Sequence, residues 1–477
     1  MAEVARAVVS APIGASSLDL SVPSRLHVVG IGGSGMSAIA TVLVAMGHQV
    51  SGSDQRPSAV LDRLAGLGIA VTVGADPEGA AAADAVAIST AIRADDPDVA
   101  SARAAGVPVL RRAEALAAIC ATRRTVAVSG THGKTSTTAM LAIALREAGF
   151  EPSFIVGGDV NGIGTGAAWG GGIDGWFVVE ADESDGTFLE LGAEAVIVTN
   201  VEPDHLDHHG SFEALQDAFA RFLLASPGPR VVCADDPVAA ALATRVGGCT
   251  TYGTSEAADV QLFDVTTDRD GVSFALRAGA DDLGRFRLPS PGLHNARNAA
   301  AVVTVGRALG ADVEGLRRGL AAFAGVGRRF ERRGEAGGVT FVDSYDHLPT
   351  EVASVLEAAR AGGWDRIVCA FQPHRYTRTA DLWRSFADAF TDADVVAVTD
   401  IYAAGQAPIP GVSGKLIVDA VLDAHPHQRV AWLPRRDDLR SWLVHELRPG
   451  DLCLTLGAGD LTTLPGELLP LVGGSPG

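Results

Sequence analysis

The chain has 477 residues, enough for about three domains that each bury a hydrophobic core of their own. Its net charge of −19 argues against general binding to nucleic acids or anionic membranes, since no basic tract offsets it. The five cysteines are scattered and form no C-x-x-C pair, which indicates reduced thiols in a cytoplasmic protein. Residues 1–22 are expected to be a disordered leader. The sequence has no apolar run of about 18 residues, so it predicts no membrane-spanning segment.

Residues 23–120 are predicted to form a Rossmann-like domain. A strand over residues 26–29 runs into G-I-G-G-S-G at 30–35, and a helix and a second strand follow. These glycines indicate only that a diphosphate can approach the start of the helix. The motif is therefore compatible with binding of NAD or of any other nucleoside diphosphate. A later strand ends at residues 89–90, which either face the same crevice or cap a turn. The residues expected to hold the ligand are Gly32, Gly33, Ser34, Gly35, Met36, Ser37, Asp54, Ser89 and Thr90.

Residues 121–326 are predicted to form a central domain that opens with a phosphate-binding loop. A short buried strand at 125–128 leads into G-T-H-G-K-T at 130–135, and a helical pattern follows. Backbone N–H groups of such a loop converge on an anion at the start of the helix, where the helix dipole favours negative charge. Lys134, one of only two lysines in the chain, is expected to reach the terminal phosphates of ATP. The predicted nucleotide-binding residues of the loop are Gly130, Thr131, His132, Gly133, Lys134, Thr135 and Ser136.

Two further strand ends are expected to place metal ligands beside this loop. One strand runs into E-A-D-E-S-D at 180–185, and another leads to D-H-L-D at 204–207. Mg²⁺ prefers one or two carboxylates together with phosphate oxygens. Thr135, Glu180 and His205 are therefore the predicted metal ligands. Zinc is disfavoured, because no cysteine or well-spaced third histidine accompanies His205.

The second half of the chain contains candidate residues for binding an adenine base and for binding a carboxylate. Asn295 lies at the start of a helix, where its amide either reads the edge of an adenine or helps to cap that helix. Residues 325–330 read as a hinge, with Arg329 near the phosphates. Strand–helix alternation then resumes and predicts a third, Rossmann-like domain over 327–477. There Arg375 and Arg378 either clamp a carboxylate or form a solvated arginine pair.

These patterns together predict an α/β chain of three domains. The outer two are Rossmann-like, and the central one has a mostly parallel sheet with a small antiparallel insertion near residues 260–288.

The order of the motifs resembles that of the Mur ligase family. The resemblance runs from about residue 25 to residue 461. Besides the motifs at 30–37, 130–135, 180–185 and 204–207, it includes H-N-x-x-N at 294–298, G-R-R-F at 327–330, F-Q-P-H-R-Y-T-R at 371–378 and A-P-I-P-G at 407–411.

The resemblance implies an ATP-dependent ligase whose first glycine loop holds UDP and not NAD. It implies two Mg²⁺ ions served by Glu180 and His205, and an adenine read by Asn295. The implied substrates are UDP-N-acetylmuramate and L-alanine, joined through an acyl phosphate by a monomer or weak homodimer whose domains close. The resemblance implies that the catalytic residues are Lys134, Glu180, His205, His347, Arg375 and Arg378. It implies that Arg329 and Asp343 bind the nucleotide and that Tyr345 and His374 bind substrate.

One segment departs from the family pattern D-D-Y-G/A-H-H-P-T-E, because residues 343–351 read D-S-Y-D-H-L-P-T-E. Ser344, Asp346 and Leu348 replace an acid, a small residue and a second histidine, which leaves the added amino acid open. A related ligase that uses glycine, serine or a peptide, and a nucleotide-binding regulator without turnover, are the alternatives. A dehydrogenase would explain only the first loop. Sister ligases bridge their metals with a carbamoylated lysine, but this chain has no lysine between Lys134 and Lys415.

Overall fold

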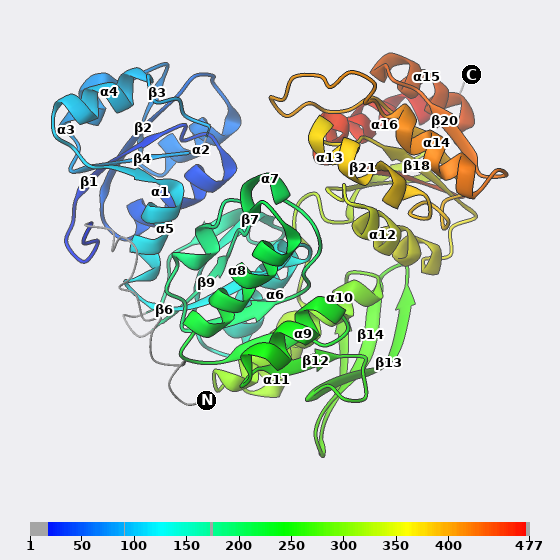
Figure 1. The fold of residues 1–477 in the computed structure, drawn as a ribbon, viewed down its shortest axis with the longest axis horizontal. Helices are drawn as coiled ribbons and strands as arrows, with labels where there is room; N and C mark the ends of the chain where they lie inside the picture. The colour runs from blue at the N-terminus through cyan, green and yellow to red at the C-terminus, as the bar shows by residue number, and fades with distance from the viewer. Residues whose placement is uncertain (1–17, 90, 172–174, 474–477) are drawn as a thin grey trace. The chain divides into compact units, whose positions relative to one another are not determined.

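The computed structural model describes residues 18–89, 91–171 and 175–473, in which helices and strands alternate (Figure 1). Residues 1–17 of the expected leader and Thr90 lie outside the described residues. The chain divides into two compact units, Met1–Gln261 with Ala300–Gly319 and Leu262–Ala299 with Leu320–Gly477. In the described ranges no helix is long and apolar enough to cross a membrane.

The first sheet is parallel and has the strand order β3-β2-β1-β4-β5. Its strands are β1 (Arg25–Val29), β2 (Gln49–Asp54), β3 (Ala70–Val73), β4 (Ala85–Ile88) and β5 (Val109–Arg111). The chain moves outward from β1 to β3 and then returns to place β4 on the other side of β1. Ligands bind at such switch points in open α/β sheets, and the glycine loop follows β1 there.

The helices of this part are α1 (Ser34–Ala45), α2 (Ala59–Gly66), α3 (Pro77–Ala82), α4 (Pro97–Ala104) and α5 (Arg112–Cys120). Three of them begin at a capping side chain that the sequence supplies. The side chains of Ser58, Asp76 and Asp96 cap α2, α3 and α4, and a proline opens α3 and α4. Helix α1 has no side-chain cap and no acid in its first turn, so its N–H groups remain suited to an anion.

The central sheet has ten strands in the order β15-β14-β13-β12-β11-β10-β6-β9-β7-β8. Pairing is parallel from β13 to β7, whereas β7–β8 and β14–β15 are antiparallel. The strands are β6 (Arg124–Ser129), β7 (Ser153–Val160), β8 (Thr165–Ala168), β9 (Trp176–Glu180), β10 (Ala195–Val198), β11 (Arg230–Cys233), β12 (Thr250–Gly253), β13 (Val260–Asp268), β14 (Gly271–Ala278) and β15 (Asp281–Leu288). The helices are α6 (Lys134–Glu147), α7 (Leu206–His209), α8 (Phe212–Ala225), α9 (Pro237–Val246), α10 (Leu293–Ala308) and α11 (Val313–Ala321). Because β6 lies between β9 and β10, the loops after these three strands share one edge.

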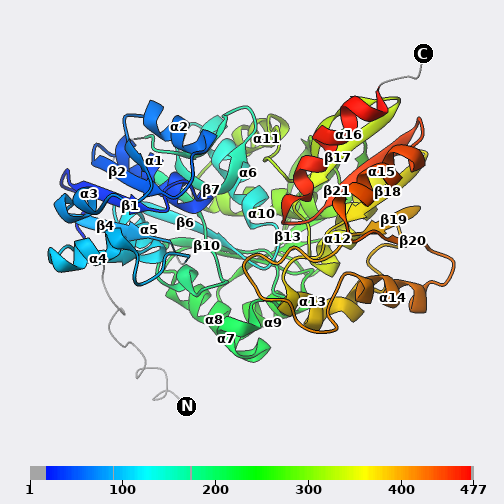
Figure 2. The same cartoon turned by 90° about the horizontal axis from the view of Figure 1, so that it is seen from above.

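The last sheet has the order β16-β17-β21-β18-β19-β20, and it is parallel except for the β16–β17 pair. Its strands are β16 (Glu331–Ala336), β17 (Val339–Ser344), β18 (Arg366–Phe371), β19 (Val395–Val398), β20 (Arg429–Trp432) and β21 (Asp451–Leu456). One core packs α12 (Pro349–Ala361) and α14 (Lys415–Ala424) on one face, and another packs α15 (Arg436–Glu446) and α16 (Leu464–Val472) on the opposite face (Figure 2). Helix α13 (Tyr376–Leu382) follows β18.

The predicted architecture is thus confirmed: α/β throughout, with mostly parallel sheets and a central sheet of mixed direction. When helices join parallel strands, the loops that follow the strands emerge at the carboxyl edge of the sheet, and most of the candidate residues lie there.

Candidate active site

The phosphate loop joins the end of β6 to the start of α6. Gly130 has φ +133°, and a Cβ there would lie 2.1 Å from Oγ1 of Thr199, so no larger residue fits. Gly133, with φ +80°, precedes the helix, whose first turn carries no acidic residue. Strand, glycine turn and uncapped helix start therefore form the anion-binding geometry that the sequence predicts.

The end of β10 fixes the shape of this loop. The backbone N–H of His132 donates to Oδ1 of Asn200 at 2.8 Å, and that of Thr131 donates to the Asn200 carbonyl at 3.1 Å. The His132 ring pairs with Glu202 at 3.1 Å. Sequence reasoning missed Asn200, although its position directly after an apolar strand was a usable signal.

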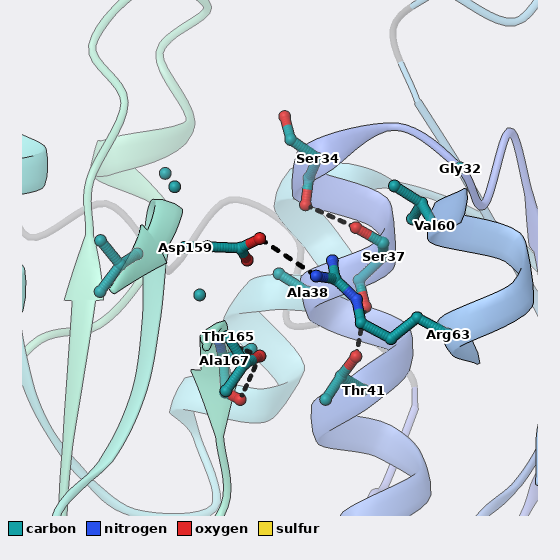
Figure 3. A pocket seen from close by; sticks show the side chains of 14 residues that line it. Gly32, Ser34, Ser37, Ala38, Thr41, Val60, Arg63, Asp159, Thr165 and Ala167 are labelled. Carbon is teal, nitrogen blue, oxygen red and sulfur yellow. Dashed lines mark hydrogen bonds and ion pairs between the residues drawn. The ribbon is translucent and has the colours of Figure 1, made fainter. Parts of the chain in front are cut away.

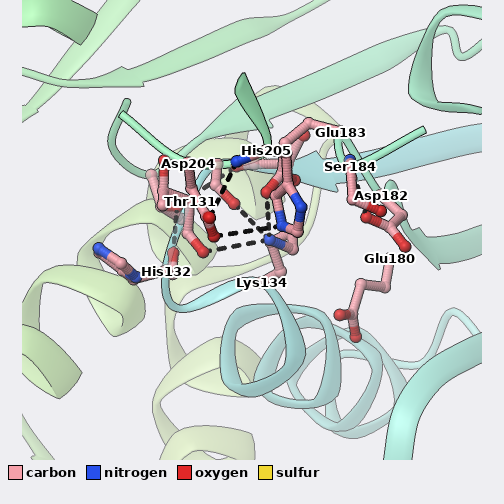
Figure 4. A network of polar contacts seen from close by, with 12 residues as sticks. Thr131, His132, Lys134, Glu180, Asp182, Glu183, Ser184, Asp204 and His205 are labelled. Atoms are coloured by element: carbon pink, nitrogen blue, oxygen red, sulfur yellow. Dashed lines mark hydrogen bonds and ion pairs between the residues drawn. The ribbon is translucent and has the colours of Figure 1, made fainter. Parts of the chain in front are cut away.

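Lys134 is enclosed by oxygen atoms (Figure 4). Its Nζ donates to the carbonyl oxygens of Gly130 at 2.6 Å and Thr131 at 3.2 Å, and to Oε1 of Glu183 at 2.9 Å. Burial acts to lower the pKa of Lys134, but the neighbouring carboxylates outweigh it and raise that pKa. The lysine is therefore a protonated cation at the start of α6.

Glu183 is the partner of Lys134 that sequence reasoning did not select. Its side chain is buried, and its second oxygen, Oε2, has no hydrogen-bond partner among the described residues. Burial raises the pKa of Glu183 to about 7, although the charge of Lys134 acts in the opposite direction. An unsatisfied buried carboxylate oxygen beside a phosphate loop indicates a place for a cation or another donor.

Thr135 and Glu180 lie together at the same edge. The Thr135 hydroxyl donates to Oε1 of Glu180 at 3.1 Å, and the N–H of Gly157 donates to Oε2 at 2.8 Å. These oxygen ligands fit Mg²⁺, which takes few protein ligands and completes its shell with phosphates and water. Among the residues that the structure describes, no group of three His, Cys, Asp or Glu side chains forms a metal cage.

His205 opens the four-residue helix α7 with a left-handed backbone, φ +53°. Its Nε2 lies 3.2 Å from a carboxylate oxygen of Asp204, whose other oxygen accepts from the His205 backbone N–H at 2.9 Å. Left-handed conformations of non-glycine residues are concentrated at functional sites. His205 and Asp204 form part of the polar group around Lys134 that Figure 4 draws.

Arg112, at the start of α5, contacts the acidic segment after β9. Its Nη2 lies 3.0 Å from Asp182 and 3.6 Å from Asp185. Burial would raise the pKa of Asp182, but Lys134, Ser184 and Arg112 outweigh it and lower that pKa to about 2. A Cβ on Gly35 would lie 3.2 Å from this guanidinium. Arg112 thus lies between the glycine loop and the acidic segment. This placement could not be predicted from the position of Arg112 in the sequence.

The glycine loop is closed by Asp54. The N–H of Gly32 donates to Oδ2 of Asp54 at 2.9 Å, and a Cβ on Gly32 would lie 2.9 Å from that oxygen. Gly33 precedes α1, and Ser34 and Gly35 open its first turn. Met36 and Ser37 are buried, and the Ser37 hydroxyl donates to the carbonyl of Ser34 at 3.0 Å. Ser89 accepts a hydrogen bond from the N–H of Ala91 at 3.3 Å, which is the turn-capping alternative.

Asn295 is buried, and its Nδ2 donates to the carbonyl of Pro291 at 2.8 Å. This contact ties the first turn of α10 to the segment before it, and it is not a helix cap, because a cap accepts from a backbone N–H. Its role toward adenine stays a prediction.

The third sheet gathers Arg328, Asp343 and Tyr345 at its carboxyl edge. Asp343 is buried and accepts from the hydroxyls of Thr455 at 2.7 Å and Thr462 at 2.5 Å, which joins the ends of β17 and β21. Arg328 has φ +62° and donates to the carbonyl of Gly457 at 3.0 Å. The guanidinium groups of Arg328 and Arg329 lie 4.8 and 5.1 Å from the Tyr345 ring centre. These contacts order the segment that departs from the family pattern.

A chain of rings continues from Tyr345. His347 lies 5.4 Å from the Tyr345 ring and 5.5 Å from that of His374, which stacks on Tyr402 at 5.8 Å. Arg378 contacts Nδ1 of His374 at 3.0 Å. The structure therefore brings together four of the residues predicted in this domain, from the loop after β17 and from the loop and helix α13 after β18.

Arg375 begins α13 with φ +71°, and its buried Nε has no hydrogen-bond partner among the described residues. A buried, unsatisfied guanidinium nitrogen on a strained backbone points to an anionic ligand such as a carboxylate.

The three departures occupy different surroundings. The Ser344 hydroxyl donates to the Asp346 carboxylate in a short contact, and it accepts from the N–H of Phe330 at 3.0 Å. Asp346 also lies 4.0 Å from Arg329. Leu348 is buried directly before α12, so its side chain serves packing. Asp346 thus carries a carboxylate two residues after Ser344, the position at which the family pattern has an acid.

Family models match most of the chain. "Mur ligase family, catalytic domain" matches residues 25–124, "Mur ligase middle domain" matches residues 128–306, and "Mur ligase, glutamate ligase domain" matches residues 328–459.

Similar proteins carry related names. A Bradyrhizobium sp. (strain ORS 278) protein named UDP-N-acetylmuramate–L-alanine ligase is 47% identical over 94% of this chain and 98% of its own. A Myxococcus xanthus protein of the same name is 45% identical over 95% and 96%. The structure of UDP-N-acetylmuramate–alanine ligase from Thermotoga maritima matches with a TM-score of 0.79 and 28% identity, covering 94% of this chain and 98% of that chain. A murein peptide ligase from Psychrobacter arcticus, 23% identical with a TM-score of 0.69 over 95% and 100%, shares the fold.

Proposed function

The chain belongs to the Mur ligase family, and from that premise we propose that it joins L-alanine to the carboxylate of UDP-N-acetylmuramate with ATP. The observation that carries this proposal is the carboxyl edge of the central sheet. There Lys134, Thr135 and Glu180 lie together at the start of α6. The product is a precursor of peptidoglycan.

The phosphate loop holds the triphosphate, and Lys134 binds its γ-phosphate in place of the loop carbonyls and Glu183. The carboxylate of the UDP-sugar attacks the γ-phosphorus, the bond to ADP breaks, and an acyl phosphate forms. Lys134 neutralises charge as the two anions approach, and the loop N–H groups hold the phosphate in line for attack. Thr135, Glu180 and His205 would hold a pair of Mg²⁺ ions, which would supply further charge neutralisation.

Amide formation then consumes the acyl phosphate. The amino nitrogen of alanine attacks the acyl carbon, loses a proton, and a tetrahedral intermediate collapses with release of phosphate. Arg375 and Arg378 bind the carboxylate of alanine, because the unsatisfied Nε of Arg375 offers a charged donor. Tyr345, His347 and His374 surround the amino acid, while Asn295, Arg329 and Asp343 serve the nucleotide.

The remaining parts of the proposal concern organisation. The domains span residues 23–120, 121–326 and 327–477, and they close during the reaction. The protein works in the cytoplasm as a monomer or weak homodimer. The glycine loop, with Gly32, Gly33, Ser34, Gly35, Met36, Ser37, Asp54, Ser89 and Thr90, binds the UDP-sugar.

The test compares the two lysines of the chain. Lys134→Ala should reduce phosphate release by at least about a thousandfold, since it removes the charge that stabilises the transferring phosphoryl group. Lys415→Ala is the matched control, because Lys415 is half-exposed and pairs with Asp419 at 2.6 Å. Phosphate release is measured with UDP-N-acetylmuramate and each of alanine, glycine and serine. Wild-type turnover by the Lys134 variant, or release that does not require the UDP-sugar, would contradict the proposal.

A further inference from the structure

A cavity of about 250 Å³ lies beside the glycine loop (Figure 3). The start of α1 forms one wall with Gly32, Ser34 and Ser37, and the β7–β8 hairpin forms the other. Arg63 and Asp159 are the only charged residues among the described residues that line it. They pair with each other at 3.0 Å, one from α2 and one from β7.

We propose that this cavity receives the anionic part of the UDP-linked sugar, and that Arg63 exchanges the Asp159 carboxylate for an oxyanion of that ligand. The inference rests on the proposed function and adds to it a binding residue and a competitor within the protein. Asp159 occupies the place at Arg63 that a phosphate or carboxylate oxygen of the ligand takes on binding.

The energetics favour such an exchange. The Arg63 and Asp159 side chains are 44% and 52% exposed, and a pair this exposed contributes little to stability because water screens it. A guanidinium binds phosphate and carboxylate groups with the same planar, charged donors. Arg63 can therefore change partners without leaving a buried charge unpaired.

The position of the cavity suits a ligand that must reach from one loop to the other. The glycine loop at residues 30–35 has no basic side chain, so a cation must come from elsewhere. Arg112 is engaged with Asp182 and Asp185. At the hairpin end, Gly157 lines the cavity and donates its N–H to Glu180, which in turn contacts Thr135. A ligand in the cavity thus extends from the glycine loop toward the phosphate loop.

The experiment measures the Kd of the full-length protein for UDP-N-acetylmuramate by calorimetry, without ATP. Arg63→Ala should raise the Kd about tenfold, the loss of one charge-assisted hydrogen bond. Asp159→Asn should leave the Kd unchanged or lower it, because it removes the competitor. The double variant should match Arg63→Ala. Arg245→Ala is the control: Arg245 pairs with Asp217 at 2.8 Å at similar exposure, away from this cavity, and the Kd should not change.

A second ligand identifies the anion. UDP-N-acetylglucosamine has the diphosphate but lacks the carboxylate, so weakened binding of both ligands to Arg63→Ala assigns the diphosphate, and weakened binding of UDP-N-acetylmuramate alone assigns the carboxylate. The proposed exchange would be wrong if Arg63→Ala left the Kd unchanged, or if Asp159→Asn raised the Kd as much as Arg63→Ala does. The ion pair would then serve only to connect α2 to β7. Failure of the wild-type protein to bind UDP-N-acetylmuramate would instead refute the proposed function.

Discussion

Lys134 and Glu183 form a buried ion pair where the nucleotide phosphates are proposed to bind. A phosphate that takes Lys134 away from Glu183 removes the charge that lowers the pKa of this carboxyl group. The pKa of Glu183, already raised to about 7 by burial, must then rise further. Near neutral pH, nucleotide binding is therefore coupled to proton uptake by Glu183.

Glu183→Gln should abolish this coupling, because glutamine has no proton to gain. At pH 7.5 without Mg²⁺ and without the UDP-sugar, we expect wild-type protein to take up more protons per ATP than the variant, by a fraction of a proton. Calorimetry in buffers of different ionisation enthalpy measures the difference, and protons released by ATP itself cancel in it. Equal uptake by the two proteins would show that Lys134 keeps Glu183 as its partner.

Asp346 is the departure from the family pattern with the clearest structural consequence. Its carboxylate receives the Ser344 hydroxyl and faces Arg329, which lies over Tyr345. Loss of that charge should loosen the segment that precedes His347.

Asp346→Asn should therefore raise the KM for L-alanine about tenfold, roughly 1.4 kcal/mol, with a smaller change in kcat. Steady-state kinetics with alanine, glycine and serine will also show whether the preference among amino acids changes. Asp381→Asn, at an exposed position of α13, is the control. A KM within twofold of wild type would mean that Asp346 does not order the amino-acid site.

At the scale of elements, the phosphate loop depends on the close approach of β6 and the end of β10. Gly130 lies against Thr199 and the backbone of Asn200, and the latter residue accepts two N–H groups of the loop. A side chain at Gly130 would separate these segments and remove the loop from its hydrogen-bond partners.

Gly130→Ala should abolish detectable ATP binding, and Gly68→Ala provides a matched control. Both glycines have positive φ, so both substitutions carry a backbone strain of about 1–3 kcal/mol, but a Cβ at Gly68 meets nothing within 4 Å. Calorimetric ATP binding and thermal unfolding of the two variants separate strain from steric conflict. Retention of wild-type ATP affinity by Gly130→Ala would contradict the geometry of the loop.

At the scale of the whole molecule, each compact unit contains hydrophobic cores of its own. One large core runs through the first unit, and two cores cover the faces of the last sheet. A ligand stabilises the part of the molecule that binds it.

UDP-N-acetylmuramate without ATP should therefore protect the first unit more than the second. At 100 times its Kd the gain is about 2.7 kcal/mol for the binding unit. Hydrogen exchange should slow at β1 and α1 and stay unchanged at β17 and β21. Equal protection of both sheets would contradict this assignment of the UDP-sugar to the glycine loop.

Local sequence determined much of this protein. Strand–helix alternation, helix caps and the glycine loops depend on residues close together in the chain, so the α/β architecture and the phosphate loop were predictable from the sequence. Gly130-x-x-Gly133-Lys134 folds as an anion site because the turn and helix start are contiguous.

Only the tertiary structure decided which charged side chains become partners. Lys134 and Glu183 are 49 residues apart, Arg112 and Asp182 are 70 apart, and Arg63 and Asp159 are 96 apart. The acidic segment offers several carboxylates, and spacing along the chain does not say which one turns toward the lysine. Strand order brings the loop edges together, and burial then selects the carboxylate that reaches Lys134. Sequence alone therefore indicated Glu180, whereas the fold paired Glu180 with Thr135 and Glu183 with Lys134.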